Sequence, residues 1–170
     1  MENFNETRFL AYVDNIYIKI LHAIMLNKLD TVRHFMNDEV SIELSNHLIE
    51  LENKNLIEMY EMTNVKSSSI NSIKELDDRF RIEVKLISRY VTYLMDKTTK
   101  KIISGDDSNR IEKTSYLIFE KIKDSKIQGI CRKCKNCGAS IDVNRDGKCK
   151  YCGSIYNLED YDWILVKINN

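Results

Sequence analysis

The residues best suited to chemistry are five cysteines, all of which lie between positions 131 and 152 of a 170-residue chain. Four of them form two matched Cys-x-x-Cys-Gly motifs, at residues 134–138 and 149–153. Two residues between the cysteines let both sulfurs point at one ion, and the glycine accepts the positive φ of a tight turn. Four thiolates select zinc or iron over hard cations. The spacing therefore predicts one metal ion held by Cys134, Cys137, Cys149 and Cys152.

The fifth cysteine, Cys131, falls outside this set. Pairing Cys131 with Cys134 would place Lys135 where the second motif has Gly153, so the glycines favour the assignment above. We interpret Cys131 as a strand-end thiol, with an exchangeable fifth ligand or a redox-sensitive neighbour as the alternative. Because all-cysteine sites are typically structural, we predict one structural zinc ion. A rubredoxin-type iron centre that transfers electrons is the alternative.

The composition of the chain is typical of a soluble globular protein. It is 43% hydrophobic and 31% charged, and its 26 basic and 26 acidic residues cancel. The cysteine segment is locally basic, but four thiolates offset part of that charge, so no nucleic-acid partner is predicted. We expect no transmembrane segment and no signal peptide, since charge interrupts every apolar stretch. The clustered cysteines favour a reducing, cytoplasmic compartment.

The first third of the chain is predicted to be helical. One helix is expected from Glu6 to Leu26, a short one capped by Asp30 and ending at Phe35, and a third capped by Asp38. Apolar residues recur at intervals of three and four along the first and third helices. These residues are Phe9, Val13, Ile16, Ile20 and Ile24 in the first helix, and Val40, Leu44, Leu48 and Leu51 in the third.

Strands are predicted from residue 53 onward. The segment RFRIEVKL (79–86) alternates strictly, with Phe80, Ile82, Val84 and Leu86 on one side, which is typical of a sheet with one solvated face. We expect this strand to continue to Met95. Residues 96–108 are predicted to be a hairpin connection, and residues 113–122 and 160–168 to be the last two strands.

These elements predict an α+β fold in which helices cover one face of an antiparallel sheet. The cysteine segment lies between the last two strands, so we interpret it as an insertion into a hairpin. The expected division is one domain of residues 1–128 with 161–170, and a zinc ribbon of residues 129–160. His22, His34 and His47 form no catalytic motif, and core packing is favoured over cavity lining for Tyr12, Tyr17 and Tyr60. No catalytic residue is predicted.

The segment CKNCGASIDVNRDGKCKYCGSIYNLEDYDWILVKI resembles the carboxyl-terminal part of bacterial Tim44-like proteins that carry a zinc ribbon. The run RFLAYVDNIYIKILHAIMLNKLDTVRHFMNDEV resembles the opening helices of the same family. The resemblance covers residues 9–168, although Lys135 stands where the ribbon commonly has proline and Cys131 is additional. It implies a cystatin-like or nuclear-transport-factor-two-like fold, in which a curved sheet wraps on helices around an apolar pocket.

The resemblance also implies a function. It suggests a non-enzymatic binding or adaptor domain linked to protein transport, with a protein, peptide or lipid partner. Peripheral contact with the inner face of a membrane is implied too, because several members of the family associate with lipid. The alternative is a small-molecule enzyme that uses the sheet pocket, which a polar acid or histidine pointing into that pocket would favour.

Overall fold

A computed structural model of the chain describes residues 4–123, 131–134, 136–142, 149–154 and 163–169. The elements follow one another as helix α1 (Glu6–Met25), the 3₁₀ turns η1 (Leu29–Thr31) and η2 (Arg33–Phe35), helix α2 (Asp38–Asn53), and strands β1 (Leu56–Glu75), β2 (Arg79–Asp96), β3 (Ile102–Ile122), β4 (Cys131–Lys133), β5 (Ser140–Asp142) and β6 (Ile164–Asn169).

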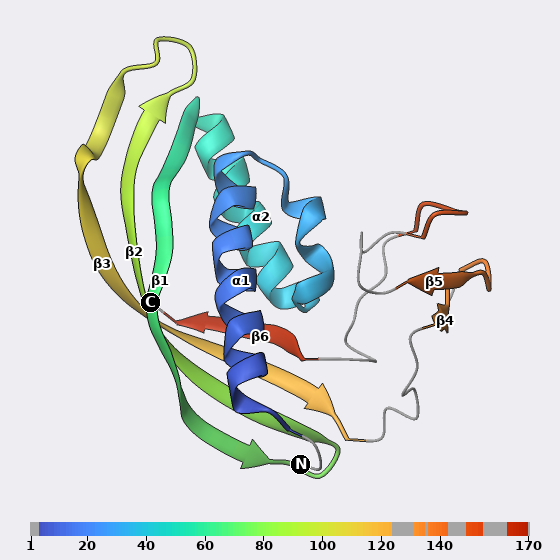
Figure 1. Cartoon of the computed structure of the whole chain (residues 1–170). Helices are drawn as coiled ribbons and strands as arrows, with labels where there is room; N and C mark the ends of the chain where they lie inside the picture. Colours follow the sequence, from blue (N-terminus) through green and yellow to red (C-terminus); the bar gives the residue numbers. More distant parts are fainter. Residues whose placement is uncertain (1–3, 124–130, 135, 143–148, 155–162, 170) are drawn as a thin grey trace.

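The long strands form one antiparallel sheet in the order β1-β2-β3-β6. The sheet is strongly curved, and both helices lie in its concave side (Figure 1). The pairing of β1 with β2 shifts register at three places, after Glu61, Val65 and Ile70. Such bulges bend a strand and increase its twist, which accounts for part of the curvature. The predicted α+β fold, with helices on one face of a curved antiparallel sheet, is confirmed.

Helix α1 supplies much of the core. Its amino terminus is capped by Asn5, whose Oδ1 accepts a hydrogen bond from the backbone N–H of Arg8 at 2.9 Å. The five residues predicted to form its apolar face are all buried. The Phe9 ring packs 5.8 Å from that of Phe119 on β3 and 5.1 Å from that of Trp163, between ring centroids. The first helix therefore joins β3 to the start of β6.

The concave face of the sheet is filled by core side chains. Ile82 and Val84 of β2 are fully buried beside their β3 partners, Phe119 and Leu117. Tyr17 is buried among them and its hydroxyl lies 3.1 Å from Ser88 Oγ, while Tyr12 and Tyr60 pack against the same core. The prediction that these tyrosines pack in the core is confirmed. Each large apolar side chain buried in this way contributes roughly 1.5–3 kcal/mol.

Two predicted helix starts are wrong. Asp30 does not cap a helix reaching Phe35; that segment forms two 3₁₀ turns in which alternate residues, such as Val32 and His34, are buried. The amino-terminal cap of α2 is Asn37, one residue before the predicted Asp38. Asn37 has extended backbone angles and its Oδ1 accepts the N–H of Val40 at 3.0 Å, whereas Asp38 is already helical.

One predicted strand bound is also wrong. Residues 96–108 are not all a connection, because β3 begins at Ile102 and the turn occupies only the preceding five residues. The turn is closed by hydrogen bonds between Asp96 and Lys101 (2.9 Å) and between Lys100 and Asp96 (3.0 Å). The polar run after Ile102 pairs with β2 in spite of its composition. The last strand is described as Ile164–Asn169, and its predicted start at residue 160 lies outside the described residues.

Candidate metal centre

The two cysteine motifs fold into the same turn. In the first, the N–H of Cys134 donates to Ala139 O at 2.7 Å, and the N–H of Gly138 donates to Cys134 O at 2.8 Å. In the second, the equivalent bonds from Cys149 to Ser154 and from Gly153 to Cys149 are both 2.9 Å. The two glycines have φ of +72° and +71°, a conformation that other residues adopt only with strain. The sequence repeat is therefore a structural repeat.

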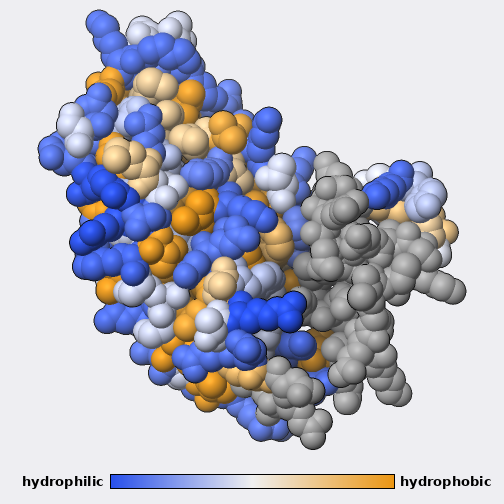
Figure 2. Space-filling model, viewed as in Figure 1, coloured by the Kyte–Doolittle hydropathy of each residue, from blue (hydrophilic) through white to orange (hydrophobic). Residues whose placement is uncertain are grey.

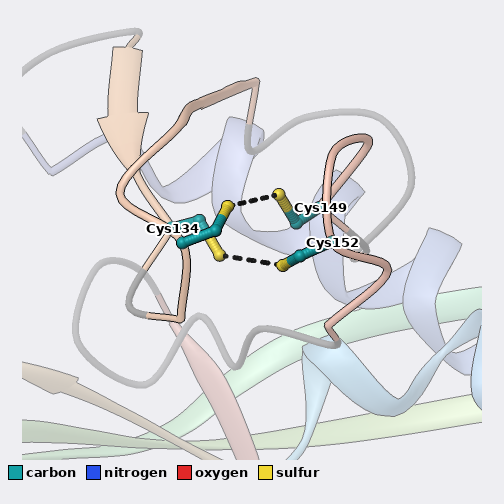
Figure 3. A group of neighbouring side chains, drawn as sticks. Cys134, Cys149 and Cys152 are labelled. Atoms are coloured by element: carbon teal, nitrogen blue, oxygen red, sulfur yellow. Dashed lines mark hydrogen bonds between the residues drawn. The ribbon is translucent and has the colours of Figure 1, made fainter.

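The turns bring four sulfurs together. All four lie within 4.8 Å of one another; Cys134 Sγ is 3.7 Å from Cys152 Sγ, and Cys137 Sγ is 3.6 Å from Cys149 Sγ (Figure 3). A tetrahedral ion with metal–sulfur bonds of about 2.3 Å separates its ligands by about 3.8 Å. In each turn the first cysteine is buried and the second is exposed. The donor set and its spacing fit one soft, tetrahedral dication.

A short hairpin presents the first turn. Strands β4 and β5 pair antiparallel on either side of it, with Lys133 opposite Ser140. Figure 1 draws this hairpin outside the curved sheet. Cys131 is the first residue of β4, and its side chain lies outside the described part of the chain. The apolar cluster here contains only Cys134, Cys149 and Ala139 among the described residues. So small a cluster gives the segment little apolar burial of its own.

The sulfurs differ in their hydrogen bonds. Ser154 Oγ lies 3.0 Å from Cys152 Sγ and 3.2 Å from Cys134 Sγ. Hydrogen bonds from its hydroxyl, before other causes, lower the pKa of both thiols, that of Cys152 to about 6. For Cys137, the N–H of Ala139 lowers the pKa, but partial desolvation and the neighbouring sulfurs outweigh it and raise the value to about 12. Four free thiols this close cannot all ionise, so full deprotonation requires a cation among them.

Sequence reasoning missed the side chains around the sulfurs. Ser154 is the clearest case, and Asn136 is another, since its Nδ2 donates to Cys152 Sγ at 3.6 Å. The sequence did contain a signal for Ser154, because the residue after the glycine is Ala139 in the first motif and Ser154 in the second. The two motifs share the Cys-x-x-Cys-Gly pattern and differ at this next position.

The three histidines stand apart from this centre. His47 Nε2 lies 2.6 Å from Glu58 Oε2 and joins α2 to β1. His22 Nε2 lies 2.9 Å from Thr63 Oγ1, and His34 is buried with its ring centroid 3.9 Å from that of Phe35. Each histidine therefore has a contact within or between elements of the helix-and-sheet body, which comprises α1 to β3 together with β6.

A surface hollow of about 540 Å³ lies between η1 and the carboxyl-terminal half of α2. Its apolar lining comes from Leu29, Leu48 and Ile49, and its charged lining from Lys28, Asp30 and Glu52. Ile49 is 57% exposed. Figure 2 shows apolar side chains scattered among hydrophilic ones over the visible described surface. The hollow thus offers a local apolar contact with a charged rim.

One comparison with known proteins agrees with the resemblance read from the sequence. A family model described as the Tim44-like domain matches residues 1–129. No curated protein matches the sequence. Among solved structures, the chain is similar to the intermembrane space region of the chloroplast protein ARC6, with 12% identity, 91% of this chain and 90% of that chain covered, and a TM-score of 0.47.

Proposed function

The chain belongs to the Tim44-like domain family, and from this membership we propose that it is a non-enzymatic binding or adaptor protein linked to protein transport. The match over residues 1–129 carries the proposal, because the family is associated with protein transport and is not an enzyme family. The matched residues include both helices and the three long strands. The partner is a protein, peptide or lipid.

The cysteine segment serves this domain as a structural zinc ribbon. We assign residues 129–160 to the ribbon, and residues 1–128 with 161–170 to the Tim44-like domain. The ligands are Cys134, Cys137, Cys149 and Cys152, whose sulfur spacing supports the assignment. A zinc ion bound by four thiolates keeps no open position for a substrate, so its role is to hold the segment together.

The partner-binding surface includes the hollow between η1 and α2. Exposed Ile49 beside Leu29 and Leu48 supports this placement, because an apolar side chain of a partner can be buried there. Lys28, Asp30 and Glu52 provide both signs of charge around it. Interfaces commonly combine an apolar centre with a polar rim.

Attachment to a membrane is peripheral, at its inner, cytoplasmic face. No helix in the described residues is long and apolar enough to cross a bilayer. The family is membrane-associated, which supports a contact of this kind. The protein would therefore meet its partner at the membrane surface.

The test is crosslinking in the native cell followed by mass spectrometry, with and without membranes. We expect one protein or lipid partner to be captured reproducibly by the wild-type chain and to be lost with Ile49→Asp. Ile103→Asp is the matched control, because Ile103 is equally exposed, at 59%, and lies on β3. Turnover of a metabolite by the purified protein, with no captured partner, would refute the adaptor function.

A further inference from the structure

The two halves of the metal centre are alike in backbone and unlike in surroundings. Cys137 and Cys152 occupy the same position in the two turns, and both are exposed. Cys152 Sγ receives contacts from Ser154 Oγ at 3.0 Å and from Asn136 Nδ2 at 3.6 Å. At Cys137, the described residues provide no hydroxyl or amide side chain within hydrogen-bond distance of the sulfur. Cys137 and Cys152 therefore have the same backbone surroundings but differ in the side-chain hydrogen bonds that their sulfurs accept.

The source of the difference is one position in the repeat. The residue that follows the glycine is Ser154 in the second turn and Ala139 in the first. The Ser154 hydroxyl also reaches Cys134 Sγ, at 3.2 Å, so its single proton serves the two sulfurs that face each other at 3.7 Å. Figure 3 shows Cys134 and Cys152 joined on one side of the cluster. The methyl group of Ala139 can make no such bond to Cys137.

Hydrogen bonds to a metal-bound thiolate withdraw electron density from the sulfur and make it a weaker nucleophile. Exposure then decides which of the remaining thiolates a reagent can reach. Cys149 is buried, whereas Cys137 is both exposed and without a side-chain donor among the described residues. Of the two exposed sulfurs, that of Cys137 is therefore the more nucleophilic.

We propose that Cys137 is the reactive thiolate of the metal centre, a modification site for soft carbon electrophiles, and that Ser154 and Asn136 protect Cys152. This rests on the proposed metal site. With a maleimide, the Cys137 sulfur forms a bond to one alkene carbon, the carbon–carbon π bond opens, and the other carbon takes a proton from water. The resulting thioether is neutral, so it is a poorer ligand and the ion is released.

The test uses the full-length, metal-loaded protein and limiting N-ethylmaleimide. Metal content is first measured by elemental analysis, and labelling is then followed by mass spectrometry with a chelating dye reporting released metal. Trypsin separates the two sites, because Cys137 falls in NCGASIDVNR and Cys152 in YCGSIYNLEDYDWILVK. We expect Cys137 to be labelled about fivefold faster than Cys152, with metal release following Cys137.

Two reciprocal variants test the cause. Ser154→Ala should raise the labelling rate of Cys152 about fivefold, and Ala139→Ser should lower that of Cys137. Equal labelling of the two cysteines in the wild type, or an unchanged Cys152 rate in Ser154→Ala, would overturn the inference while leaving the metal site in place. A protein that binds no metal at the outset would overturn the metal site itself, and this inference with it.

Discussion

The helix-and-sheet body and the cysteine segment are stabilised in different ways. The body buries a continuous set of large apolar side chains, with Phe119, Ile82 and Leu86 fully inaccessible. The apolar cluster of the cysteine segment, among the described residues, consists of two cysteines and an alanine. A core of the first kind can support a fold by itself, whereas a segment of the second kind needs an added constraint. The chain thus combines a body with a large apolar core and a segment with very little apolar burial among the described residues.

Removing a metal ligand gives the largest expected effect on this comparison. Structural zinc binding by four thiolates contributes about 10–16 kcal/mol in small domains, so Cys149→Ser should lose nearly all bound metal. The body should stay folded, because its core does not include this residue. Elemental analysis measures the first effect and circular dichroism the second.

Cys131→Ser is the control for the ligand variant. We expect it to retain the full metal content, because the assignment leaves Cys131 outside the ligand set. An equal loss of metal in Cys131→Ser would show that the register of the first motif is wrong. Unfolding of the body in Cys149→Ser would show that the two regions are not independent.

A large-to-small substitution in the core of the body tests whether the cysteine segment depends on that core. Phe119→Ala removes a fully buried ring that contacts Phe9, and it should lower the free energy of unfolding by about 3–5 kcal/mol. Urea titration measures this change. Metal content per folded chain should not change; a parallel loss of metal would mean that the ribbon depends on the body.

A helix-cap variant has a smaller expected effect. Asn37→Ala removes the side chain that accepts the N–H of Val40, and it should cost about 1 kcal/mol in urea titration. Asp38→Ala is the matched control, since Asp38 lies inside the first turn and is exposed. A larger cost for Asp38→Ala would restore the cap that sequence reasoning had favoured.

The smallest expected effect is a pH-dependent one on the sheet. Burial raises the pKa of Glu120, but hydrogen bonds from Arg79 and Arg81 outweigh it and hold the value below its usual 4.5. Because the folded-state pKa is lowered, these bonds stabilise the body above about pH 4.5, and the contribution is lost as pH falls through the folded value. Glu120→Gln should therefore cost about 0.5 kcal/mol at pH 7 and less at pH 3. Urea titrations at both pH values measure it; an unchanged difference would contradict the ion-pair account.

Sequence patterns predicted the body well where periodicity was strong. The apolar face of α1 and the alternation of β2 both follow from spacing, because a buried face repeats with the helix or strand period. Boundaries were harder. Asn37 and Asp38 are both good caps, and only the backbone angles distinguish them. The start of β3 was missed because its polar residues resemble a loop, although their backbone groups pair with β2.

The sequence by itself determined that four cysteines would form two equal turns, since Cys-x-x-Cys-Gly spacing constrains the backbone locally. It also placed those turns between two strands, which the pairing of β3 with β6 bears out. Only the tertiary structure decided that Ser154 would face Cys134 and Cys152 while Ala139 left Cys137 without an equivalent donor. The reason is that a turn is a local property of the chain, whereas a contact between two turns depends on how they meet in space.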